Sequence, residues 1–191
     1  SKDGSISCAT CHHQHKAFTD GLKFSKGIND QEGDKNSMPL FNLAWKSSFF
    51  WDGRAKSLRD QVLQPIQDHR EMASDLKTVV AQLQKNESHA FENAFGPGPV
   101  TEEKIALALE NFLLTLTSYD SKFDRAMSGK AKLSEAEQRG MELFFTEYEP
   151  RSQQYGADCF HCYGGSFFSD HQFHNNGLKP SLSDVGLMKV T

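Results

Sequence analysis

The stretch Ser7-Cys8-Ala9-Thr10-Cys11-His12 decides how the rest of the chain is interpreted. Cys-x-x-Cys-His is the pattern through which haem is covalently attached to a protein. The two thiols can add to the haem vinyl groups, and the imidazole that follows the second thiol can take an axial position on the iron. Because Cys-x-x-Cys pairs also occur in zinc sites and thiol redox motifs, those two interpretations stay open on this motif alone.

The four cysteines of the chain fall into two such pairs, Cys8 with Cys11 and Cys159 with Cys162. Two pairs indicate two cofactor sites. A single zinc site built from both pairs is disfavoured, because the segment between them is far longer than the spacing of a zinc ribbon.

The composition is that of an ordinary globular protein of one or two domains: 191 residues, 37% of them hydrophobic, with a net charge of -4. No apolar run is long enough to cross a membrane. Lysines and arginines are scattered, so the chain has no electrostatic footprint for nucleic acid. Covalent haem attachment belongs to oxidising compartments, so we expect a periplasmic protein whose leader has been removed before Ser1.

Hydrophobic periodicity and capping signals predict a mainly α fold. Four helices are expected: a short one from 57 that Pro65 ends, one over 74–95, one from 101 to about 127, and one over 134–145 with Met141, Phe144 and Phe145 facing inward. Residues 13–50 and 164–191 are rich in turn-forming residues and are expected to be irregular. The stretch Ser128-Gly129-Lys130 is the candidate boundary between domains 1–128 and 129–191.

A pair of histidines and a run of three aromatic residues each allow two interpretations. His13 and His15 follow the first cysteine motif, and solvent exposure is favoured over a ligand role for both. The aromatic residues Phe49, Phe50 and Trp51 are either ordinary core or the wall of a haem pocket. A tryptophan between two redox centres could also serve as an intermediate site in electron transfer.

Several motifs occur together in one order along the chain. They are Cys8-Ala9-Thr10-Cys11-His12, Phe18-Thr19-Asp20-Gly21, Asn36-Ser37-Met38-Pro39, Phe50-Trp51-Asp52-Gly53-Arg54-Ala55, Gln61, Pro65, Glu71-Met72, Cys159-Phe160-His161-Cys162 and Phe173-His174-Asn175-Asn176-Gly177. With these motifs the sequence resembles the bacterial dihaem cytochrome c peroxidases, a family that includes MauG-type enzymes. The resemblance implies two mainly helical, cytochrome c-like domains with one haem each, the second incomplete at its C-terminal end.

The resemblance also implies roles for individual residues. His12 would be the proximal ligand of the peroxidatic haem, with Glu71 and Gln61 on the opposite side of that haem. Trp51 would lie on the electron path between the haems, and Asn36 would bind a calcium ion. A carboxylate such as Glu71 can take a proton from peroxide and return it to the departing oxygen.

The implied activity is the reduction of hydrogen peroxide to water, with electrons supplied by a small cytochrome c or cupredoxin through the second haem. Oxidation of a protein side chain, as MauG performs it, is the alternative enzyme. A dihaem electron carrier without peroxide chemistry and a zinc-binding module are the alternatives from other classes. A homodimer is left open, and no nucleic-acid partner is expected.

The sequence departs from the family pattern at two points. Residues 24–50 contain no histidine that could block the first iron, so an open site is expected there, as in MauG-type members. At the second motif the ligand position holds Tyr163, whose phenolate can bind haem iron as in catalase. An altered residue and a site without normal ligation are the alternatives, and His171 and His174 are fallback ligands.

Overall fold

The computed structural model describes residues 1–175 and 185–189. Of these, residues 1–117 and 185–189 form a first compact unit and residues 118–175 a second. The expected haem domains 1–128 and 129–191 stay a prediction, because compactness of the polypeptide alone does not define a haem domain. Asn176 and Gly177 of the family pattern lie outside the described residues.

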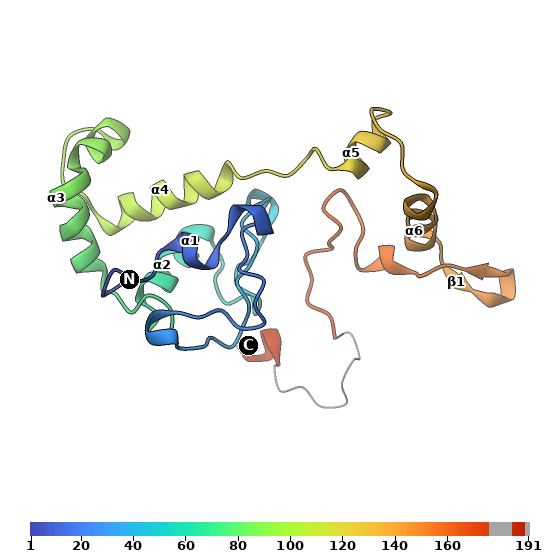
Figure 1. Cartoon of the computed structure of the whole chain (residues 1–191), viewed down its shortest axis with the longest axis horizontal. Coiled ribbons are helices and arrows are strands. Elements are labelled where there is room, and N and C mark those ends of the chain that lie inside the picture. The colour runs from blue at the N-terminus through green and yellow to red at the C-terminus, as the bar shows by residue number, and fades with distance from the viewer. Residues whose placement is uncertain (176–184, 190–191) are drawn as a thin grey trace. The chain divides into compact units, whose positions relative to one another are not determined.

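Helices dominate the described residues, which confirms the mainly α fold class (Figure 1). The α-helices are α1 (Cys8–Cys11), α2 (Leu58–Gln67), α3 (Leu76–Phe95), α4 (Glu102–Leu114), α5 (Lys122–Met127) and α6 (Glu135–Phe145). The strands are β1 (Tyr148–Glu149) and β2 (Gln154–Tyr155), which pair antiparallel. No helix in the described part of the chain is both long enough and apolar enough to cross a membrane.

The core of the first unit lies between α2 and α4, and α3 adjoins the start of α4 (Figure 1). It is built from buried apolar side chains of the two helices and of the loop before α2: Leu43, Phe49, Ala55, Leu58, Val62, Ala106 and Leu113. Phe49 is therefore core, whereas its neighbour Trp51 is 46% exposed.

The long irregular segment predicted over residues 13–50 is confirmed. Among its residues the structure has only short 3-10 turns and isolated bridges, such as His13 with Thr19 and Lys26 with Glu32. These bridges give the loop a fixed path next to α1 without forming a sheet.

Two helix predictions were wrong. The helix expected from 101 to about 127 is interrupted, since α4 ends at Leu114 and α5 begins at Lys122. The carbonyl of Leu116 accepts a hydrogen bond from the backbone N–H of Asn42 at 2.9 Å instead of from the next helical turn. Pro65 does not end α2, which runs on to Gln67, because a proline near the last turn removes only one intrahelical hydrogen bond.

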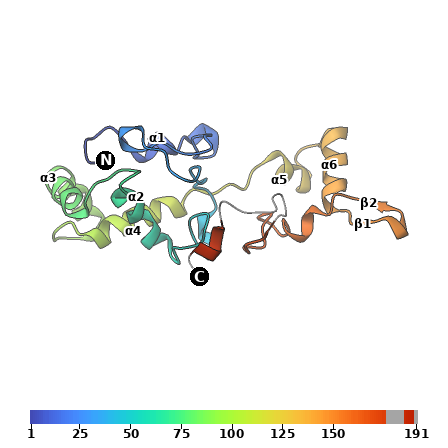
Figure 2. The same ribbon diagram turned by 90° about the horizontal axis from the view of Figure 1, so that it is seen from below.

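The second unit contains α5, α6 and the two-stranded hairpin that follows α6 (Figure 2). The predicted capping box is confirmed: Ser134 accepts from the N–H of Glu137, and the Glu137 carboxylate accepts from the N–H of Ser134. Phe144 packs edge-on against Phe168 at 5.7 Å between ring centroids. The inward position predicted for Phe145 was wrong, because this side chain is 48% exposed at an open cavity.

Candidate haem sites

The first cysteine pair lies on the single turn of α1. Its two thiols are three residues apart and therefore on the same side of the helix. Both are free thiols, Cys8 exposed and Cys11 half-buried. Ser7 and Thr10 close the start of the turn with a reciprocal capping box, which fixes the spacing of the thiols.

His12 follows this turn, and its ring is oriented by the loop after it. The His12 backbone N–H donates to Cys8 at 3.0 Å, and the ring nitrogen Nδ1 lies 2.7 Å from the carbonyl oxygen of Phe18. Because a carbonyl can only accept, Nδ1 carries the proton and Nε2 is left with its lone pair free for a metal. Phe18 belongs to one of the motifs quoted above, but no role at this site was predicted for it, since it acts through its backbone oxygen.

Glu71 lies close to this motif, although it is far from it in sequence. The Cys11 thiol is 3.7 Å from the carbonyl oxygen of Lys26, and two residues later the N–H of Ile28 donates to the Glu71 carbonyl at 2.8 Å. Gly27 lies between these contacts. A Cβ atom there would be 1.9 Å from the carbonyl oxygen of Arg70, so only glycine allows the two segments to approach so closely.

The electrostatic environment of Glu71 favours its protonated form. Burial raises the pKa of the Glu71 carboxyl, and the charge of Asp68 raises it further, while Arg54 and Arg70 act in the opposite direction. Burial also raises the pKa of the Cys11 thiol, helped by the nearby charges of Asp20 and Glu71. The Glu71 carboxyl therefore lies close enough to the Cys11 thiol to affect the pKa of that thiol.

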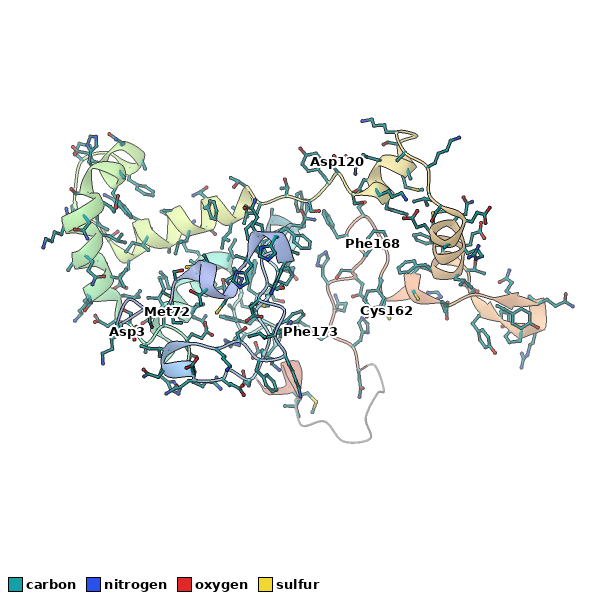
Figure 3. All side chains as sticks on the ribbon, viewed as in Figure 1. Asp3, Met72, Asp120, Cys162, Phe168 and Phe173 are labelled. Atoms are coloured by element: carbon teal, nitrogen blue, oxygen red, sulfur yellow. The ribbon has the colours of Figure 1, made fainter. Side chains whose placement is uncertain are left out.

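The turn that carries Glu71 is fixed from both sides. Met72 donates its N–H to Pro65 at 3.3 Å and accepts at its carbonyl from Lys2 at 2.9 Å. Figure 3 shows Asp3 beside Met72 accordingly. Gln61 lies half-buried in α2, the helix that leads into this turn.

Arg54 is held rigidly in the segment before α2. Its guanidinium donates from one nitrogen to both carboxylate oxygens of the buried Asp52 at 3.0 Å, and it lies 3.5 Å from the ring centroid of Phe50. Trp51, between these residues, donates its indole N–H to the backbone oxygen of Asn36 at 3.0 Å. The structure thus joins Trp51 and Asn36, two residues singled out in the sequence.

Asn36 as a calcium ligand stays a prediction. Among residues 1–175 and 185–189 no group of three or more His, Cys, Asp or Glu side chains is arranged to hold a metal ion.

The second cysteine pair lies on a short 3-10 turn, Cys159–His161, with Cys162 directly after it. Both thiols are free. The next residue, Tyr163, donates its backbone N–H to Cys159 at 3.0 Å. The segment is attached to α6, because Ala157 donates its N–H to Leu143 at 2.7 Å.

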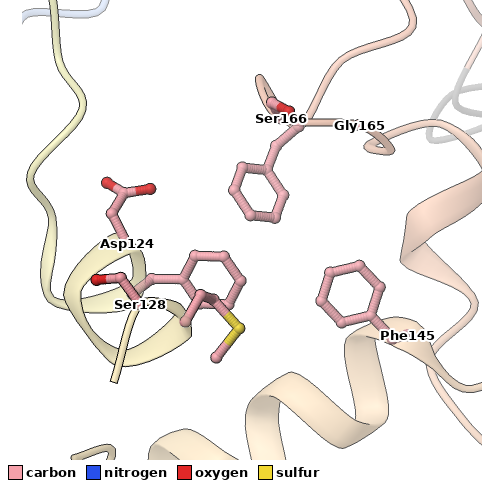
Figure 4. Close-up of a pocket in the computed structure, with 8 residues that line it drawn as sticks. Asp124, Ser128, Phe145, Gly165 and Ser166 are labelled. Atoms are coloured by element: carbon pink, nitrogen blue, oxygen red, sulfur yellow. The ribbon is translucent and has the colours of Figure 1, made fainter. Parts of the chain in front are cut away.

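The second unit also has an open cavity of about 430 Å³. Its lining is mainly aromatic and apolar and comes from α5, α6 and the segment after the second cysteine pair: Phe123, Asp124, Met127, Ser128, Phe145, Gly165, Ser166 and Phe168. Figure 4 shows phenyl rings from these three segments around one space. Such a lining suits a flat, largely apolar group such as a porphyrin.

The residues present therefore fit covalently attached haem. The two cysteines of each pair are free and lie three residues apart, the imidazole of His12 has a free Nε2, and the unit that contains the second pair has an apolar cavity. Within the described residues no large side chain is completely buried, so the protein atoms alone leave the apolar interior incompletely covered.

Comparison with known proteins gives one family. The di-haem cytochrome c peroxidase family matches residues 1–132. The chain is 33% identical over 189 residues to the methylamine utilization protein MauG of Methylophilus methylotrophus, covering 97% of this chain and 54% of that protein. It is also 33% identical over 199 residues to the cytochrome c551 peroxidase of Nitrosomonas europaea, covering 100% of this chain and 56% of that protein.

A solved structure agrees with this assignment. The crystal structure of a MauG-like protein associated with microbial copper homeostasis has a TM-score of 0.85 and 28% identity, covering 100% of this chain and 60% of that chain. The chain spans about half the length of the curated relatives it matches. The match of the family over more than half of the chain, together with these relatives, confirms the resemblance seen in the sequence: the chain belongs to the di-haem cytochrome c peroxidase family.

Proposed function

We propose that this chain is part of a di-haem c-type peroxidase that reduces hydrogen peroxide to water with electrons from a small cytochrome c or cupredoxin. Relatives named cytochrome c551 peroxidase support the reaction class. The observation that carries the proposal is Glu71: its backbone is held against the segment that contacts the Cys11 thiol, and the surroundings of its carboxyl raise the pKa of that group.

When bound through Cys8, Cys11 and His12, a c-type haem supplies an iron that can accept peroxide and exchange electrons. Glu71 then acts as general base and general acid: its carboxylate takes a proton from peroxide and returns it to the departing oxygen. A raised pKa suits this cycle, because it makes the carboxylate a stronger base toward peroxide, and the proton it takes is then available for the departing oxygen. The charges of Arg54 and Arg70 act against this rise in the pKa of Glu71.

The other residues of the first site have supporting roles in this proposal. His12 would hold the haem iron through Nε2, and its ring is oriented by the hydrogen bond from Nδ1 to the carbonyl oxygen of Phe18. Gln61 hydrogen-bonds peroxide or water without titrating. Trp51 carries electrons from the second haem. A periplasmic location, a calcium ion at Asn36 and a homodimer stay predictions.

The test is Glu71→Gln in the haem-loaded protein, which keeps the shape of the side chain and removes its proton transfer. We expect peroxide turnover to fall by about 10²- to 10⁴-fold, with an unchanged haem count and absorbance spectrum. Glu92→Gln, at an exposed position on α3, is the matched control and should leave turnover unchanged. Equal turnover in wild type and Glu71→Gln would show that the acid–base role is wrong.

Oxidation of a protein side chain is the second candidate. Two observations favour it: residues 24–50 contain no histidine that could block the first iron, and the chain is 33–35% identical to several MauG proteins. The two functions separate when peroxide is supplied with a reduced small cytochrome c. A peroxidase oxidises the cytochrome stoichiometrically, whereas the MauG-type activity consumes peroxide only when its protein substrate is present.

A further inference from the structure

The two cysteine motifs have the same backbone hydrogen bond. In the first, the residue after the second cysteine, His12, donates its N–H to the carbonyl oxygen of Cys8 at 3.0 Å. In the second, Tyr163 donates its N–H to the carbonyl oxygen of Cys159 at 3.0 Å. The backbone of Tyr163 therefore has the same position relative to Cys159 and Cys162 as the backbone of His12 has relative to Cys8 and Cys11.

Two of the three described histidines of the second unit already have carboxylate partners. His161 lies inside the Cys-x-x-Cys turn, where its Nε2 is 3.0 Å from Asp158, and its ring packs against Phe160 at 4.3 Å between centroids. His174 has its Nε2 2.6 Å from Asp170.

The remaining groups are His171 and Tyr163. His171 lies nine residues after Cys162 and has no place in the attachment turn. Tyr163 is 58% exposed, and within residues 1–175 and 185–189 its hydroxyl makes no hydrogen bond. Tyr163 thus offers an unengaged oxygen directly after the thiols.

We propose that the Tyr163 phenolate is the iron ligand supplied by the second attachment motif, in place of histidine. On coordination the phenol O–H bond breaks, an oxygen–iron bond forms and the proton goes to solvent, with no change of oxidation state. Phenolate is anionic where imidazole is neutral, so it stabilises ferric over ferrous iron. The second haem then has a lower reduction potential than a histidine-ligated haem in the same surroundings.

This inference rests on the di-haem part of the proposed function but not on peroxide turnover. It has a consequence for the electron path: a haem with a low potential passes electrons onward readily but must be reduced by a correspondingly reducing donor. The second site would therefore select among donors by potential as well as by surface contact.

The test uses the haem-loaded protein and four variants, of which His171→Ala examines the alternative ligand. Tyr163→Phe removes the oxygen, and Tyr163→His restores the ordinary motif. Tyr155→Phe, at an exposed tyrosine on β2, is the matched control. Resonance Raman spectra report iron–phenolate vibrations, potentiometric titration reports the two haem potentials, and mass spectrometry of peptides reports haem on each cysteine pair.

We expect phenolate bands in wild type and Tyr155→Phe and their loss in both Tyr163 variants. Tyr163→His should raise the potential of one haem and leave the other unchanged, with both haems retained. Unchanged spectra and potentials in Tyr163→Phe would overturn the proposal, as would a wild-type chain with free thiols at Cys159 and Cys162. Loss of the second-haem signal in His171→Ala, with no effect of Tyr163→Phe, would assign the ligand to His171 and also overturn it. The Glu71→Gln result affects only the peroxidase proposal, so the two failures are distinguishable.

Discussion

Substituting Gly27 by alanine should disturb the first site through the backbone alone. Gly27 has φ -103° and ψ -152°, which alanine can adopt, so any effect comes from contact rather than from conformational strain. The new Cβ would be 1.9 Å from the Arg70 carbonyl oxygen and 2.6 Å from that of Glu71. To reach an ordinary contact of 3.4 Å, the segments must separate by about 1.5 Å.

This separation removes the 2.8 Å hydrogen bond between Ile28 and Glu71. Overpacking costs about 1–3 kcal/mol and the lost hydrogen bond about 1 kcal/mol, so the free energy of unfolding should fall by about 2–4 kcal/mol. A displacement of about 1 Å at the carboxyl should lower peroxide turnover by about 10²-fold in the molecules that remain folded.

Urea denaturation and peroxide turnover of the haem-loaded Gly27→Ala protein measure both effects. Gly140→Ala is the matched control, because a Cβ at Gly140 in α6 meets no heavy atom within 4 Å. This control should stabilise the protein by about 0.5–1 kcal/mol and leave turnover unchanged. If Gly27→Ala unfolded at the urea concentration of wild type and turned over peroxide as fast, the close approach of the two segments would be refuted.

Two further predictions concern stability. Leu58→Ala, at a core side chain that is 4% exposed, should lower the free energy of unfolding by about 2–5 kcal/mol, whereas Leu114→Ala, at 38% exposure, should cost about 1 kcal/mol or less. Equal urea midpoints for these two variants would contradict the packing of α2 on α4. The raised pKa of Glu71 means that the folded protein binds this proton more tightly than the unfolded chain, whose carboxyl titrates near the ordinary value of 4.5. The free energy of unfolding should therefore fall as pH rises through the window between that value and the raised pKa. Glu71→Gln lacks this contribution, so its free energy of unfolding relative to that of wild type should increase across the same window. Urea denaturation at pH values below and above the window measures this. A difference between the two proteins that does not change with pH would contradict the raised pKa of Glu71.

The helices that sequence predicted well are those with local start signals. α3 and α6 begin after Asp75 and Ser134, and each of these side chains accepts a hydrogen bond from the first turn of its helix. The prediction failed where a long-range contact overrode periodicity: the bond from Asn42 to Leu116 draws the chain out of the helix after α4. No local sequence pattern around Leu116 predicts its hydrogen bond with Asn42.

The candidate site shows the same division. The cysteines and His12 were identified from the spacing of the Cys-x-x-Cys-His motif, whereas Glu71 was singled out only through the family resemblance. Phe18 and Gly27 were missed as parts of the site. Phe18 acts through its backbone oxygen, and Gly27 matters because it has no Cβ atom. Gly27 lies in the segment expected to be irregular, but only the close approach of Arg70 and Glu71 shows why glycine is needed there.

The most direct test of the account is the number and location of covalent haems in the purified protein. Denatured mass, a pyridine haemochrome spectrum and peptide mapping give both quantities in one preparation. We predict two haems per chain, one on Cys8 and Cys11 and one on Cys159 and Cys162. One haem on the first pair alone would contradict the second site and its electron path, and the absence of any covalent haem would contradict the account as a whole.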